Sequence, residues 1–143
     1  MKRSVLVLFV VALFSSAYAS QKVTAERLEA IAKRLGYETV VKYIDRTPVV
    51  MVKTRSGYLF WSTENARVDL ISLSEKRYRG KDVLERINRF NERIIFAEAF
   101  LHKGKVGIGM NMAAIEGASD EMLVRFLGKF LVLKEVLNEY FGE

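Results

Sequence analysis

The sequence predicts an α+β fold in which an antiparallel sheet, made of a meander and a hairpin, packs against an N-terminal helix and a long C-terminal helix. Two amphipathic helical patterns, at residues 24–35 and 119–141, flank several short stretches of alternating apolar and polar residues. The connections between those stretches are too short for the crossovers that parallel strands need. A chain of 143 residues is long enough for one domain with a proper core and short for two.

The first nineteen residues have the pattern of a secretory signal peptide. Lys2 and Arg3 form a basic start, residues 5–14 are wholly apolar, and Ala17 and Ala19 supply small residues where a signal peptidase cuts. We expect cleavage after Ala19 and an exported protein, either periplasmic or secreted. The alternative is a membrane anchor, but a spanning helix needs ~20 apolar residues and the apolar stretch covers only residues 5–14. A lipoprotein is excluded because the chain has no cysteine to acylate.

Cleavage leaves a single predicted domain over residues 20–143. Without Lys2 and Arg3 it carries 21 of the 23 basic residues against 17 acidic ones, a net charge of +4. This mild excess is spread along the sequence, which does not describe a nucleic-acid binder. Because there is no cysteine, no disulfide contributes to stability, and packing must supply it.

The first predicted helix begins at the N-cap Thr24 and ends at Gly36, which suits a left-handed C-cap. A turn between two strands then follows, and it begins at Asp45 and ends at Pro48. Proline lacks an amide hydrogen, so Pro48 belongs at the entry of a strand and not inside one. The four strand candidates of the meander are residues 39–44, 49–53, 58–61 and 67–73.

A second helix is predicted over residues 81–93, after a polar and basic stretch at residues 75–81. We interpret that stretch as a solvated loop, with an anionic docking patch as the functional alternative. Asn88 and Asn91 lie three residues apart, on the same side of the helix. Asparagine is a poor helix former, so we expect this pair to tie the helix end to neighbouring loops or strand edges. Recognition of a ligand or partner is the alternative.

The predicted hairpin pairs residues 94–101 with residues 105–112. In its second strand, large apolar residues alternate with Gly107, Gly109 and Asn111, so one face is nearly bare. Bare glycines on a sheet usually indicate a closely packed backbone or a bulge, and less often a groove for a peptide.

The last helix begins after the N-cap Ser119 and has more than one apolar row. The row that we select as the candidate interface is Phe126, Phe130, Leu133 and Leu137. An apolar surface this wide either lies under other elements or meets a second chain, so a homodimer is one possibility.

No pattern in the sequence indicates catalysis, a metal site or a cofactor. His102 is the only histidine, and it lies beside a hairpin turn with no cysteine to activate. No serine lies in a nucleophile-elbow pattern, and the calcium-loop pattern of alternate aspartates is missing. We therefore do not expect an enzyme.

The chain resembles the YbjN family of bacterial proteins. The resemblance rests on residues 45–50, on residues 87–91 and on the hairpin of residues 101–112, which leads through Gly117 into the last helix. It implies a sensory-transduction regulator with a fold like that of the type III secretion chaperones, which are dimeric and non-enzymatic. It supplies no catalytic residues. Many members are cytoplasmic, so the predicted signal peptide is a departure that argues against a direct intracellular regulatory role.

Two functions remain open from the sequence. The first is an exported interaction module, an adaptor, chaperone-like or regulatory protein that binds a protein or peptide partner through its sheet and C-terminal helix. The second is a small-ligand or lipid sensor, with a pocket between the sheet and the last helix lined by methionines and aromatic residues. Neither nucleic acid nor, after signal cleavage, a stable membrane span is expected.

Overall fold

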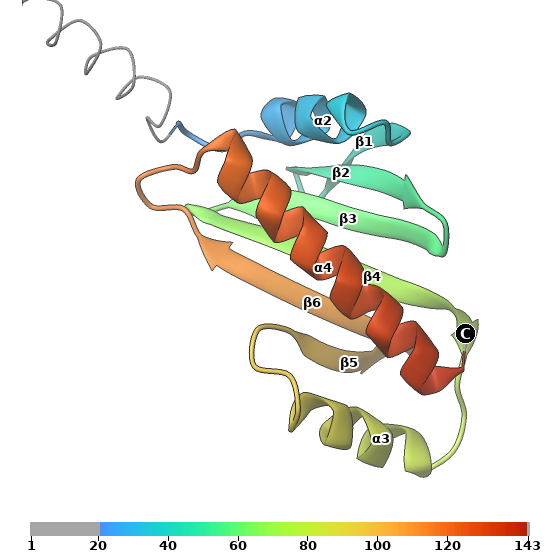
Figure 1. The fold of residues 1–143 in the computed structure, drawn as a ribbon. Coiled ribbons are helices and arrows are strands. Elements are labelled where there is room, and N and C mark those ends of the chain that lie inside the picture. The colour runs from blue at the N-terminus through green and yellow to red at the C-terminus, as the bar shows by residue number, and fades with distance from the viewer. Residues whose placement is uncertain (1–20, 143) are drawn as a thin grey trace, which may run out of the picture.

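The structure, a computed structural model, describes residues 21–142 and consists of a six-stranded antiparallel sheet with three helices (Figure 1). The helices are α2 (Ala25–Arg34), α3 (Asp82–Asn91) and α4 (Asp120–Phe141). The strands are β1 (Thr39–Ile44), β2 (Thr47–Thr54), β3 (Gly57–Glu64), β4 (Arg67–Arg77), β5 (Glu98–His102) and β6 (Lys105–Ala113). The predicted α+β class is confirmed. The predicted signal peptide lies outside the described residues, and none of the described helices is long and apolar enough to cross a membrane.

The strands lie in the order β1-β2-β3-β4-β6-β5, so the pairing of β4 with β6 joins the meander to the hairpin. Strand β4 is longer than predicted. After a register shift beyond Leu73 it continues to Arg77, which pairs with Lys105. Part of the stretch that we interpreted as a loop is therefore strand.

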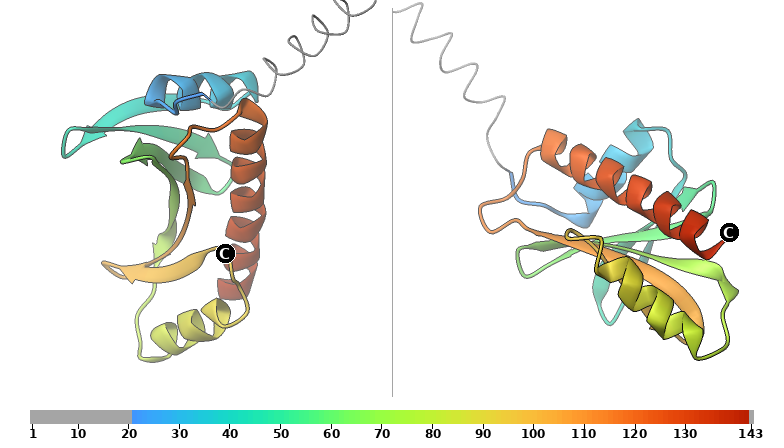
Figure 2. Two further views of the ribbon diagram at one scale, coloured as in Figure 1. Left: turned by 90° about the vertical axis from the view of Figure 1, so that its left-hand side faces the viewer. Right: turned by 60° about the horizontal axis from the view of Figure 1, so that its bottom comes forward.

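Helices α2 and α4 cover one face of the sheet, and α3 lies beside β5 (Figures 1 and 2). The largest fully buried side chains come from both layers: Trp61, Leu59, Leu70 and Ile108 from the sheet, and Leu28, Ile31, Leu123, Leu127 and Phe130 from the helices. The left view of Figure 2 shows the sheet curving away from α4, with no described helix on its other face. Trp61 is the only tryptophan of the chain, so its fluorescence reports on this core.

The predicted interface row on α4 is mostly a core row. Phe130 is 0 % exposed, and Phe126 and Leu137 are buried with it against the sheet. Only Leu133 is partly exposed. The row is apolar because it packs inside the protein's own domain, and three of its four residues are not accessible to a second chain.

The glycine-bearing face of β6 also differs from the prediction. A Cβ at Gly107 would lie 2.5 Å from the ring of Phe100 and 2.8 Å from the side chain of Leu73. These two side chains cover the glycine, where we expected a backbone, and the register shift of β4 begins directly after the Leu73–Gly107 pair. Gly109 has only ordinary contacts around it.

Arg27 holds the start of α2 against the start of α4. Its guanidinium donates to the Asp120 carboxylate at 2.6 and 2.8 Å, to the Ala118 carbonyl at 2.7 Å and to the Gln21 carbonyl at 2.9 Å. The hydrogen bond from Arg27, with a further one from Arg34, lowers the pKa of Asp120 below its ordinary value of 3.8. One side chain therefore joins two segments that are far apart in the sequence, the start of α2 and the start of α4.

Asn91 ties α3 to the outer edge of β5. Its amide donates to the Ala99 carbonyl at 2.9 Å, and its carbonyl accepts from the Ala99 N–H at 2.7 Å. Asn88 is exposed, and its side chain has no hydrogen bond to the described residues. The structural interpretation of this pair is thus correct for Asn91 alone. Strand β5 begins at Glu98 and not, as predicted, at Ile94, because the chain first turns away from the end of α3.

We expect Asn91→Ala to lower the free energy of unfolding by about 1–3 kcal/mol, because it leaves the buried N–H and C=O of Ala99 without partners. Asn88→Ala is the matched control and should change it by less than about 0.5 kcal/mol. Urea unfolding followed by Trp61 fluorescence measures both. Equal effects of the two variants would contradict the assigned role of Asn91.

The depressed pKa of Asp120 predicts a pH-dependent stability difference. A carboxyl whose pKa is lower in the folded state than in the unfolded state stabilises the fold when the pH is above its unfolded-state pKa. This stabilisation is lost as the pH falls through the folded-state pKa. Asp120→Asn should therefore be less stable than the wild type at pH 7, and the difference should shrink below about pH 4. Urea titrations between pH 2.5 and 7 test this, and a pH-independent difference would contradict it.

Candidate functional site

Strand β6 extends beyond its partner β5. The first pair of these two strands, next to the turn, is His102 with Lys105, and the last pair is Glu98 with Gly109, where β5 begins. Strand β6 continues to Ala113, paired on its other side with β4. We call the last four residues of this strand, 110–113, the β6 edge.

The backbone groups along the β6 edge are partly unpaired. The Ala114 N–H donates to the Ala66 carbonyl at 2.6 Å, and the Val106 N–H donates to Ser74, so even-numbered residues face β4. Because the direction alternates along a strand, the N–H and C=O groups of Asn111 and Ala113 face away from β4. Within residues 21–142 no hydrogen bond is made to them there. An extended chain could therefore continue the sheet at this edge.

A hollow of about 640 Å³ lies on the helix side of the β6 edge. Met110 forms its base, with α4 on one side and the loop before β5 on the other. We call it the helix-side hollow, and it is lined by Phe96, Met110, Arg125, Gly128, Lys129, Val132 and Leu133. Phe96 is 77 % exposed and Val132 is 64 % exposed, which is unusual for such large apolar side chains.

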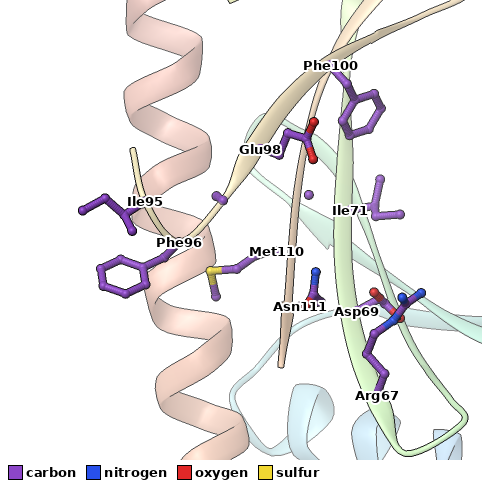
Figure 3. A pocket seen from close by; sticks show the side chains of 11 residues that line it. Arg67, Asp69, Ile71, Ile95, Phe96, Glu98, Phe100, Met110 and Asn111 are labelled. Carbon is purple, nitrogen blue, oxygen red and sulfur yellow. The ribbon is translucent and has the colours of Figure 1, made fainter. Parts of the chain in front are cut away.

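A second hollow of about 580 Å³ lies on the other face of the sheet (Figure 3). We call it the open-side hollow; Asp69, Ile71, Phe100 and Asn111 are among its lining residues. Phe96 borders both hollows. Arg67 pairs with Asp69 at 2.9 Å, whereas Glu98, also at its border, makes no ion pair among the described residues and leaves one negative charge there.

The two hollows and the edge together match the needs of an extended peptide. Successive side chains of a strand point to opposite faces of a sheet. A strand beside Asn111 and Ala113 would therefore direct alternate side chains into the helix-side and the open-side hollow, while its backbone bonds to β6. The described residues include no group of three or more His, Asp or Glu side chains that could hold a metal ion.

The structure does not bring the predicted motif residues into this site. Asp45 lies in the β1–β2 turn with a φ of 47°, and Pro48 pairs with Tyr43 inside β2. Asn91 lies at the far edge of β5, and of the predicted interface row only Leu133 reaches the helix-side hollow. The candidate site lies on the sheet and the last helix, but apart from Leu133 its residues are not the ones that we predicted.

Sequence reasoning missed Phe96 and the β6 edge for the same reason. It extended the preceding strand back to Ile94, which would have paired residues 94–97 with the end of β6. Asn91 is the signal that could have shown the shorter strand. Had its side-chain amide been assigned as a cap on the backbone of Ala99, the start of the strand would have been placed close to Ala99.

Of the comparisons with known proteins, one identifies the family and another supports the fold. The YbjN family model, described as "Putative bacterial sensory transduction regulator", matches residues 24–142. A solved structure, "Crystal structure of YbjN, a putative transcription regulator from E. coli", is similar with a TM-score of 0.60. The similarity covers 77 % of this chain and 84 % of that one at 11 % identity, which shows a common fold and nothing finer. No curated protein matches in sequence. Since the family model spans nearly all of the described residues, the chain belongs to the YbjN family.

Proposed function

We propose that this protein is an exported, non-enzymatic interaction module that binds an extended segment of a partner protein beside β6. The observation that carries the proposal is the β6 edge, where two unpaired residues lie between two hollows. The description of the family as a regulator supports binding rather than catalysis as its activity. The secretory pattern of residues 1–19 supports export.

Backbone pairing would supply affinity, and the helix-side hollow would supply most of the selectivity. Burying a large apolar side chain is worth about 1.5–3 kcal/mol. An apolar residue of the partner would cover Phe96 and Val132, two side chains that are otherwise largely in water. The bare Gly128 leaves room for it, since no atom lies within 4 Å of a Cβ built there.

The rim of the helix-side hollow favours an acidic partner segment. Lys129 is exposed and makes no ion pair with the described residues, and Arg125 pairs only with Glu121 on its own helix. A carboxylate flanking the apolar residues of the partner would lie near these two cations. We therefore expect alternate apolar residues with an Asp or Glu near one end.

A second candidate function is favoured by the volume of the same hollow. About 640 Å³ between the sheet and α4 lies within the range of small-ligand pockets, and its Met110 and Phe96 are the residue types expected for a lipid sensor. A fatty acid could place its chain over Met110 and its carboxylate near Lys129.

Selection from a phage library of random linear 12-residue peptides, followed by fluorescence anisotropy, tests the primary proposal. Selected peptides should show alternate apolar residues and bind at least about tenfold more weakly to Val132→Glu and Phe96→Glu, which place charge in the helix-side hollow. Asn111→Pro should weaken binding similarly, because it removes the outward N–H without touching the pairing with β4.

The matched controls are Leu84→Glu on α3 and Val40→Glu on β1, which are 55 % and 56 % exposed outside both hollows. Both should bind like the wild type, and Trp61 fluorescence should show that every variant is folded. Binding that Val132→Glu leaves unchanged would refute the site. A saturable rise in melting temperature with laurate, lost in Val132→Glu, would instead support the lipid sensor.

A further inference from the structure

The positive charge of the described chain is concentrated in one place, although it looks evenly spread in the sequence. Residues 21–142 contain 21 Lys and Arg against 16 Asp and Glu. Two short segments, residues 75–82 and 102–105, hold six of these cations and only two of the carboxylates. Everything outside them is almost neutral, with 15 cations against 14 carboxylates.

The fold places these two segments side by side. Arg77 pairs with Lys105 at the end of β4, and the Tyr78 N–H donates to the Gly104 carbonyl at 2.7 Å. The β4–α3 connection therefore lies against the β5–β6 turn. We call this surface the basic end, and its cations are Lys76, Arg77, Arg79, Lys81, Lys103 and Lys105.

The cations of the basic end are available to a partner. None of the seven ion pairs found among residues 21–142 includes any of the six. All are exposed except Lys105, which is half-buried. The carboxylates of their own segments, Glu75 and Asp82, leave a local excess of four positive charges.

The shape of the basic end fits a surface better than a pocket. The small hollow beside Tyr78 holds only about 10 Å³, and none of the six cations is among its lining residues. Lys103, with a φ of 49°, lies at the tip of the β5–β6 turn, and Arg79 lies in the neighbouring connection. Cations on two adjacent turns can meet one plane of negative charge at the same time. An acidic peptide would need a groove between them.

We propose that the basic end docks the protein onto a membrane surface that contains anionic phospholipids. Clusters of four to eight Lys and Arg bind such surfaces, with a contribution of about 1 kcal/mol from each cation close to the headgroups. This is peripheral, electrostatic attachment and involves no apolar insertion. The proposal does not depend on the peptide site, because the two surfaces share no residue.

Co-sedimentation of the purified protein with vesicles of phosphatidylcholine containing 30 % phosphatidylglycerol tests the proposal. Binding should be strong at 50 mM NaCl, weak at 500 mM, and absent with pure phosphatidylcholine. The double variant Arg79→Gln/Lys103→Gln should bind about thirtyfold more weakly, since it removes two of the six cations.

The matched control is Lys22→Gln/Lys42→Gln, which removes two exposed cations away from the basic end and should bind vesicles like the wild type. Val132→Glu should also bind vesicles normally, which separates this proposal from the peptide site. Equal losses in the two double variants, or no preference for phosphatidylglycerol, would overturn it. So would binding to poly-glutamate but not to vesicles, which would make the basic end a site for acidic protein.

Discussion

The packing of α4 on one face of the sheet is the constraint on which the other features depend. Phe126, Phe130 and Leu137 lie in the core with Trp61, and each buried side chain of this size contributes about 1.5–3 kcal/mol. With no disulfide available, this burial has no covalent substitute. It commits the apolar rows of α4 and α2 to the same face, and no helix of residues 21–142 covers the opposite face of the sheet (Figure 2).

The same packing explains why the unpaired edge lies where it does. Helix α4 crosses the sheet diagonally (Figure 1). Val132, which is 64 % exposed, lines the helix-side hollow together with Phe96 from the loop before β5. Asn91 caps the outer edge of β5 at Ala99, which blocks strand addition there. No residue among 21–142 caps the β6 edge in this way, although exposed edges favour aggregation and proteins usually protect them. An edge left open between two hollows is better explained by binding than by folding.

The sequence was sufficient for features that depend on local pattern. The helices, the Ser119 and Thr24 caps and the strands of the meander follow from periodicity and capping chemistry, and both caps form their hydrogen bonds. The sequence was insufficient where the structure depends on pairing between strands that are far apart in the chain. The pairing of β4 with β6 extends β4 to Arg77 and joins two basic segments, and no local pattern encodes either result. The prediction of the interface row was wrong for a related reason. Periodicity shows that Phe130 lies on an apolar face of the helix, but it does not show what covers that face.

The two proposed surfaces lie at opposite ends of one strand, and this limits how they can act together. Lys105 begins β6 and Asn111 lies six residues later, roughly 20 Å away along the strand. The segment between them is rigid, because Val106 and Ile108 are buried and the strand is paired on both sides as far as Gly109. A membrane contact at one end therefore has no evident route for changing the shape of the other. It would instead fix the orientation of the β6 edge and raise the local concentration of membrane-bound partners, which increases occupancy without any conformational change.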